Sequence, residues 1–109
     1  MSKAYELGLY EKAMPGTLTW KERLEAAKAA GYDYVEISID ATEEKIARLD
    51  MDRESRLELV KTMYETGIPI RTMCVSALTK YAIGSSDEAC CARGMAILEK
   101  SLQLADDLG

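Results

Sequence analysis

Short runs of apolar residues alternate along the chain with longer stretches in which apolar side chains recur every three or four residues. The first pattern is typical of buried strands and the second of amphipathic helices. Strands are predicted over 6–11, 32–40 and 68–77. Long helices are predicted to follow each strand, with a short extra helix over 42–49. This strand–helix order implies parallel strands joined by right-handed crossovers.

Polar residues that can cap a helix precede each of the three long helical stretches. Two of these starts carry the capping-box pattern, in which the first and fourth residues satisfy each other's backbone N–H groups. They are Thr19 with Glu22 and Ser85 with Glu88, while Asp52 can cap the middle helix. Each stretch ends at a glycine, which adopts positive φ without a Cβ clash. These glycines are Gly31, Gly67 and Gly109.

Apolar spacing also predicts which side of each helix is buried. The first helix carries a stripe of Trp20, Leu24 and Ala27. The second carries Leu57, Val60, Met63 and Tyr64. The third carries Cys91, Met95, Leu98, Leu102 and Ala105. We expect these three stripes to form the buried faces of the helices.

The faces of the predicted strands favour a barrel over an open, doubly wound sheet. In the second strand Val35, Ile37 and Ile39 share one face, whereas Glu36 and Ser38 share the other. A doubly wound sheet is covered on both sides and favours apolar residues on both. A (β/α)₈ barrel instead carries functional residues on its inner face, near the carboxyl ends of the strands. No Gly-x-Gly-x-x-Gly or Walker loop follows the first strand. The sequence therefore predicts an α/β fold, a partial (β/α)₈ TIM barrel.

Length limits how much of such a barrel this sequence can form. A whole barrel needs about 250 residues, so 109 residues supply the first three βα units. We expect residues 1–109 to be the N-terminal part of one barrel domain, in which both outer strands have open edges. Unpaired N–H and C=O groups at such edges invite pairing with another chain. A homo-oligomer formed through the open strand edges is therefore expected.

Composition narrows the function. The formal net charge of −5 disfavours binding to nucleic acid phosphates and anionic membranes. The chain contains no histidine, which removes Ser–His and Cys–His nucleophiles and most zinc sites. Three cysteines without paired spacing do not make a disulfide framework, and no apolar run approaches membrane-spanning length. We expect a soluble cytoplasmic protein that binds neither nucleic acid nor a membrane.

Polar side chains gather at the carboxyl ends of the predicted strands, where barrel enzymes carry their active sites. Alternation points six of them into the barrel: Tyr10, Lys12, Glu36, Ser38, Cys74 and Ser76. This set suits a sugar or polyol that needs many directional hydrogen bonds. Lys12, Arg71 or Lys80 could neutralise a phosphate, although alternation turns Arg71 toward the helices.

Simpler interpretations compete with a functional one at several of these positions. A lone strand glutamate such as Glu36 is more often a structural group than a functional one. Cys74 is more often a small core residue than a nucleophile, because nothing near it in sequence would lower its pKa. The run from Asp40 to Glu44 is interpreted as a solvated helix start. We predict no catalytic residue and no metal ligand in this chain.

Five strings, taken in order, resemble the L-ribulose-5-phosphate (L-xylulose-5-phosphate) 3-epimerases, which belong to the xylose-isomerase-like TIM barrels. The strings are Gly8–Pro15, Trp20–Leu24, Tyr34–Asp40, Met73–Ala77 and Ile83–Ser85. The resemblance implies epimerisation at C3 of a ketopentose 5-phosphate in L-ascorbate and pentose utilisation. It also implies a divalent metal, Mn²⁺, Mg²⁺ or Zn²⁺, that polarises the carbonyl while carboxylates move the proton.

In that family the metal ligands and both catalytic carboxylates lie on later strands. The resemblance therefore implies that this chain holds only part of the substrate-facing rim and is inactive alone. The matched rim positions are Tyr10, Glu36, Cys74 and Ser76. One position departs from the family, which usually has histidine where this chain has Leu78.

Two other functions stay open at this point. The chain could be a non-catalytic partial barrel that self-associates as a structural module. It could also belong to a free-ketose 3-epimerase of the same superfamily. Lys12 and the string around it favour the branch that uses phosphorylated sugars.

Overall fold

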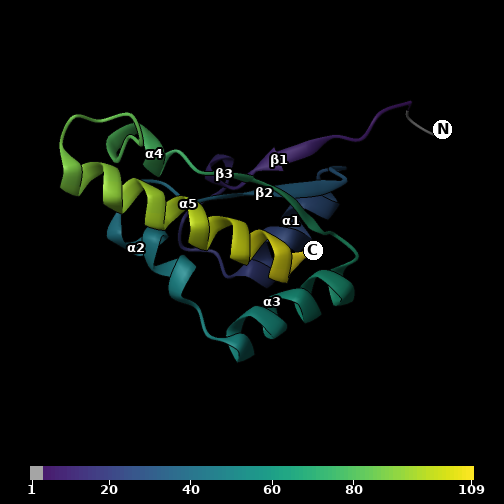
Figure 1. Cartoon of the computed structure of the whole chain (residues 1–109). Helices are drawn as coiled ribbons and strands as arrows, with labels where there is room; N and C mark the ends of the chain where they lie inside the picture. The colour runs from purple at the N-terminus through teal and green to yellow at the C-terminus, as the bar shows by residue number, and fades with distance from the viewer. Residues whose placement is uncertain (1–3) are drawn as a thin grey trace.

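The computed structural model describes residues 4–109, which form a three-stranded sheet flanked by helices (Figure 1). The elements in order are β1 (Gly8–Tyr10), η1 (Glu11–Ala13), α1 (Trp20–Ala29), β2 (Tyr34–Ser38), α2 (Glu43–Ile46), η2 (Ala47–Asp50), α3 (Arg53–Thr66), β3 (Ile70–Cys74), α4 (Ala77–Lys80) and α5 (Glu88–Leu108). All strands are parallel, in the spatial order β1-β2-β3. No helix of this described part is long and apolar enough to cross a bilayer.

The long helices α1, α3 and α5 lie on one side of the sheet, and its other side carries no helix within residues 4–109 (Figure 1). One-sided helical cover is the arrangement of a barrel wall, whose inner face turns away from the helices. The prediction of a partial α/β barrel is confirmed. The helix-free side is called the open face below.

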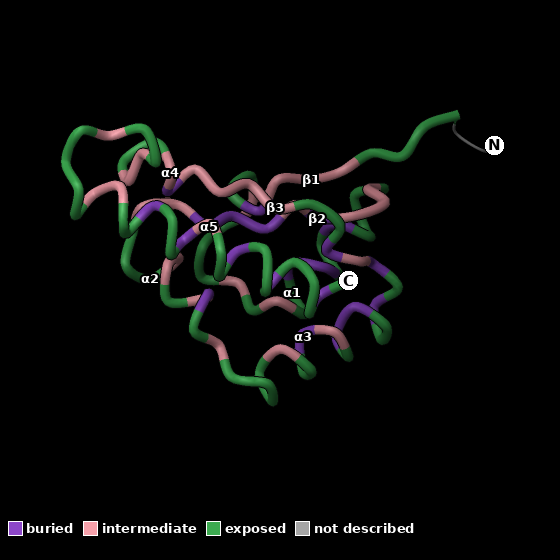
Figure 2. Tube along the Cα trace, in the orientation of Figure 1, coloured by how far each residue is buried: buried purple, intermediate pink, exposed green. Residues whose placement is uncertain are grey.

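The core lies between the sheet and the helices, as the buried segments in Figure 2 show. Val35, Ile37 and Ile39 on or just after β2 point to this side and are almost completely buried. Leu24 on α1 and Leu104 on α5 meet them from the helix layer. Alternation along β2 therefore separates an apolar helix side from a more polar open face, as predicted.

Two strands end earlier than predicted. After Tyr10 the chain turns into η1, so Lys12 lies on that turn and not on a strand. After Cys74 two hydrogen bonds continue the ladder, since Ile39 N donates to Cys74 O and Ala77 N donates to Ile39 O. Ser76 nevertheless has helical backbone angles and is the N-cap of α4. Strand alternation, from which Lys12 and Ser76 were predicted to point into the barrel, therefore applies to neither, because the backbone leaves the extended conformation first.

A bulge in the pairing of β2 with β3 changes the orientation of Arg71. Val35 pairs with Ile70 and Glu36 with Thr72, so Arg71 is an extra residue between two paired positions. Its guanidinium lies 5.5 Å from the ring centroid of Tyr34 and forms an ion pair with Glu6. Alternation predicted that Arg71 faces the helices. This prediction is wrong, because the bulge interrupts the alternation.

The buried side of α3 differs from the predicted apolar stripe. Leu59 and Met63 are buried together with Thr62 and Thr66, whereas Leu57 is 56% exposed. Tyr64, also in the predicted stripe, is exposed. The two threonines can be buried because each hydroxyl donates to a carbonyl of its own helix, at 2.9 Å. The predicted stripe of α3 is therefore confirmed at Met63 and wrong at Leu57 and Tyr64, and Val60 is half-buried against the core.

The buried side of α5 also differs from the prediction. Gly94 and Ser101 lie on the buried side, while Met95 and Leu102 of the predicted stripe are exposed. A Cβ atom on Gly94 would overlap the backbone carbonyl of Tyr81. Only glycine permits this close approach of α5 to the segment that follows α4. The packed face of α5 therefore combines the small residues Gly94 and Ser101 with Ile97, Leu104 and Leu108.

Most predicted helix boundaries are confirmed. Thr19 and Glu22 form the reciprocal capping box, and Asp52 caps α3. At α5 the cap is Asp87, whose carboxylate accepts from the first backbone N–H groups, while Ser85 accepts from Asp87 N. The predicted box of Ser85 with Glu88 is therefore wrong. All three helix-ending glycines, Gly31, Gly67 and Gly109, have positive φ.

Candidate functional site at the carboxyl ends of the strands

Strand register places several predicted site residues side by side on the open face. Tyr10, Glu36 and Thr72 form one row across the sheet, and Ser38 pairs with Cys74 in the next. The Tyr10 hydroxyl donates to Ser38 Oγ at 3.0 Å, which links β1 to β2. Thr72 Oγ1 donates to Glu36 Oε2 at 2.7 Å, which links β3 to β2. These residues form the polar rim of the open face.

Lys12 extends this rim from η1. Its Nζ lies 2.7 Å from Oδ2 of Asp40, which follows β2. The other oxygen of Asp40 accepts from the backbone N and hydroxyl of Thr42, at 2.9 and 2.6 Å. Partial burial disfavours the charged carboxylate, but the bonds from Lys12 and Thr42 outweigh it and lower the Asp40 pKa to about 2. The sequence predicted that Asp40 belongs to a solvated helix start. Asp40 is instead half-buried and bonded to Lys12 and Thr42.

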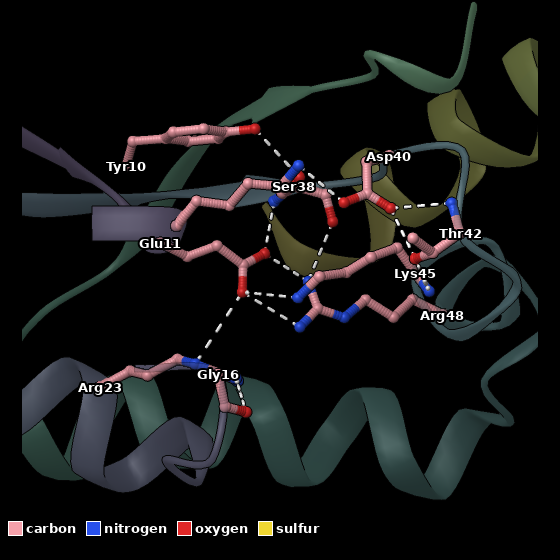
Figure 3. A network of polar contacts seen from close by, with 10 residues as sticks. Tyr10, Glu11, Gly16, Arg23, Ser38, Asp40, Thr42, Lys45 and Arg48 are labelled. Atoms are coloured by element: carbon pink, nitrogen blue, oxygen red, sulfur yellow. Dashed lines mark hydrogen bonds and ion pairs between the residues drawn. The ribbon is translucent and has the colours of Figure 1, made fainter. Parts of the chain in front are cut away.

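Glu11 is the site residue that the sequence analysis missed. Its side chain is only 2% exposed and lies on the helix side of the sheet (Figure 3). Oε1 accepts from Ser38 N at 2.5 Å. The guanidinium of Arg48 donates to Oε1 and also to Oε2, the latter at 3.0 Å. Lys45 Nζ lies 3.4 Å from Oε2 and Arg23 Nε lies 3.9 Å from it. One buried carboxylate thus faces three cations.

These contacts stabilise the charged form of Glu11. Burial alone would raise its pKa, but hydrogen bonds from Arg48 and Ser38 N, with the charges of Arg48 and Lys45, lower it below the ordinary value. The signal in the sequence was an acidic residue that alternation turns toward an apolar layer. Such a residue needs buried partners. Its partners come from helices whose positions the sequence does not reveal.

The sole tryptophan of the chain belongs to the same network. The Trp20 ring lies 4.9 Å from the guanidinium of Arg23 and 5.1 Å from that of Arg48. Arg23 also donates to Gly16 O at 3.1 Å, and Arg48 donates to Ser38 O at 2.9 Å. We call Glu11, Trp20, Arg23, Lys45 and Arg48 the Glu11 cluster. It connects η1, α1, α2 and η2 beneath the polar rim.

The remaining predicted site residues, Cys74 and Ser76, have fewer contacts with the rim. Cys74 is half-buried with a free thiol. The hydrogen bond to Asp40 is the main cause that raises the Lys12 pKa, and the nearby Cys74 adds to it. Ser76 is half-buried and its carbonyl accepts from the Thr79 hydroxyl at 2.7 Å. Leu78 packs against the core. The structure thus joins Tyr10 to Ser38 directly but gives Ser76 no such link.

The rim does not by itself provide a metal site. Across residues 4–109 no three His, Cys, Asp or Glu side chains converge in a group that could hold an ion. Asp40 is already paired with Lys12, and Glu36 accepts from Thr72. The donors present therefore do not fit the divalent cation implied by the resemblance.

Comparison with known proteins agrees with the observed barrel wall. A family model described as Xylose isomerase-like TIM barrel matches residues 24–109. The chain belongs to this family. Among curated relatives, the L-ribulose-5-phosphate 3-epimerase UlaE of Escherichia coli O139:H28 is 47% identical over all 109 residues. A putative L-ribulose-5-phosphate 3-epimerase UlaE of Shigella dysenteriae serotype 1 matches equally. The chain spans 38% of the length of each of these relatives.

Acid is expected to destabilise the folded chain through Asp40. Its folded pKa of about 2 lies below the ordinary value of 3.8, so its stabilising effect is complete above about pH 5 and is lost as pH falls toward 2. The lowered pKa of Glu11 acts in the same direction. Urea unfolding at a series of pH values measures this. Lys12→Met should flatten the curve, and an unchanged curve in that variant would contradict the role of the pair.

Proposed function

We propose that this chain is the first part of a ketopentose-5-phosphate 3-epimerase and supplies part of its substrate rim. The observation that carries the proposal is the 47% identity over the whole chain to proteins named L-ribulose-5-phosphate 3-epimerase. The proposed substrates are L-ribulose 5-phosphate and L-xylulose 5-phosphate, which differ at C3. The cytoplasm is the proposed compartment, since free cysteines suit a reducing environment.

The polar rim offers the chemistry that a sugar phosphate needs. The Tyr10 hydroxyl can accept from a sugar while it donates to the fully buried Ser38, and the Glu36 carboxylate accepts from sugar hydroxyls. Lys12 supplies a positive charge at the rim, and its contact with Asp40 sets the direction of its ammonium group. Cys74 and Ser76 complete the proposed substrate-binding set.

Epimerisation at C3 requires one group that removes a proton and another that returns it on the opposite face. It also requires stabilisation of the enediolate, which a divalent metal supplies in the implied mechanism. The described rim does not offer this combination, because its two carboxylates are already engaged by neighbours. We propose that Mn²⁺, Mg²⁺ or Zn²⁺ and the catalytic carboxylates belong to the portion of the relatives that this chain does not cover.

Purified alone, the 109-residue chain is expected to give no turnover of L-ribulose 5-phosphate with any of the three metals. In a chimaera, this chain replaces the matching segment of the Escherichia coli relative. The chimaera should convert L-ribulose 5-phosphate to L-xylulose 5-phosphate. Within the chimaera, Glu36→Gln should lower kcat/KM about 10-fold, as expected for one hydrogen bond to a charged group. The exposed Glu25→Gln serves as the control. Turnover by the isolated chain would contradict the proposed inactivity, and an inactive, folded chimaera would contradict the function.

The sugar itself is tested by a panel that includes the unphosphorylated ketopentoses. Lys12 favours the phosphorylated substrates, because its ammonium group is a cation at the rim. Equal kcat/KM for phosphorylated and free sugars would instead place the chimaera with the free-ketose epimerases.

A second candidate function is self-association without catalysis. It is favoured by the open edges of β1 and β3 and by the exposed apolar side chains of Met95 and Leu102 on α5. Sedimentation analysis should then find a homo-oligomer that Leu102→Lys weakens. A monomer at all concentrations would contradict this candidate.

A further inference from the structure

Two side-chain pairs of the rim connect the end of β1 to the end of β2. Tyr10 is bonded to Ser38 and Lys12 to Asp40. Glu11 lies between the two β1 partners in sequence, and its carboxylate accepts from the backbone N of Ser38. Glu11 is therefore covalently joined to Tyr10 and Lys12, and its carboxylate holds the backbone of Ser38, two residues before Asp40.

Arg48 closes this connection from the helix side. Its guanidinium donates to the Glu11 carboxylate and, at 2.9 Å, to the carbonyl of Ser38 (Figure 3). The N–H and C=O of Ser38 are thus both held by the same ion pair. Asp40 follows two residues later, so the direction in which the chain leaves β2 depends on this pair.

We propose that Glu11 is a positioning residue, which fixes the end of β1 against the end of β2 so that the pairs Tyr10–Ser38 and Lys12–Asp40 face the substrate in one preset arrangement. An apolar side chain of equal size would fill the space but would leave Ser38 N and Arg48 without their partner. That these pairs face a substrate rests on the proposed epimerase function. The role of Glu11 in holding the two pairs in place does not depend on that function.

The test uses the full chain and measures the rim without any enzymatic assay. In Glu11→Gln the amide keeps the length of the side chain but loses the charge that holds Arg48. The carboxyl of Asp40 is titrated by carbon NMR, since its partners are Lys12 from η1 and Thr42 from its own loop. Its pKa should rise from about 2 toward the ordinary 3.8, as Lys12 loses its fixed place, while the bonds from Thr42 remain. The fluorescence maximum of Trp20 should shift in the same variant.

Glu44→Gln is the matched control, because it removes an exposed charge from α2 outside the Glu11 cluster. It should leave the titration and the fluorescence unchanged. If Glu11→Gln does not fold, the Asp40 pKa is measured in Arg48→Lys instead. Lysine keeps the charge but cannot hold Glu11 and the Ser38 carbonyl together. A smaller movement of the Asp40 pKa is expected there.

An Asp40 pKa that stays near 2 in a folded Glu11→Gln or Arg48→Lys variant would overturn the positioning role, and so would an equal movement in Glu44→Gln. Failure of the proposed function is seen separately, as an inactive chimaera that carries the unaltered segment. The NMR titration does not depend on that result.

Discussion

Glu11→Ala is expected to lower the free energy of unfolding by about 3–5 kcal/mol, the usual effect of removing one partner from a buried ion pair. The substitution leaves Arg48, Lys45 and Arg23 facing one another without a carboxylate, and it removes the acceptor of Ser38 N. A loss of this size approaches the whole stability of many small domains. Urea unfolding followed by circular dichroism measures it.

Glu44→Ala provides the comparison, because its exposed side chain should contribute no more than about 0.5 kcal/mol. Adding Arg48→Ala to Glu11→Ala should cost less than the sum of the two single changes, since the second removes a cation that the first left unpaired. A Glu11→Ala chain within about 1 kcal/mol of the parent would show that the Glu11 cluster is not a stabilising centre.

Leu59→Ala is expected to destabilise the chain by about 2–5 kcal/mol, as for other buried leucines that leave a cavity. Leu59 is 5% exposed and belongs to the buried apolar core. Leu57→Ala, only two residues away on the same helix, should change stability by about 0.5 kcal/mol or less, because Leu57 is mostly exposed.

This pair tests the rotation of α3 directly, since the same change of residue type is made twice on one helix. The sequence pattern predicted the opposite ranking, with Leu57 in the buried stripe. Thermal or urea unfolding of both variants ranks them. If Leu57→Ala proved the more damaging, α3 would have to be rotated relative to the arrangement described above.

The buried sides of the helices show why apolar spacing was an incomplete guide. On α3, Thr62 and Thr66 are buried because their hydroxyls are satisfied by the helix itself. On α5, Gly94 is buried because the backbone of Tyr81 approaches it closely. A count of apolar residues omits both kinds of position, and includes exposed ones such as Leu102.

Half of the candidate site followed from alternation along strands. Tyr10, Glu36 and Ser38 were predicted to share the open face, and the register of β1 and β2 brings them together. Arg71 escaped the prediction because a bulge adds one residue to β3. Glu11 escaped it because its partners Arg23 and Arg48 are distant in sequence and meet only after α1 and η2 pack together.

By itself the sequence determined the repeating strand–helix order, the helix-ending glycines and the capping of α1 and α3, since each depends on local backbone preferences and hydrogen bonds. It also determined the two faces of β2, because side chains alternate strictly along a regular strand. Tertiary structure alone decided the rotation of α3 and α5, the bulge at Arg71 and the surroundings of Glu11. Those features depend on which distant groups come into contact, and local patterns carry no information about that.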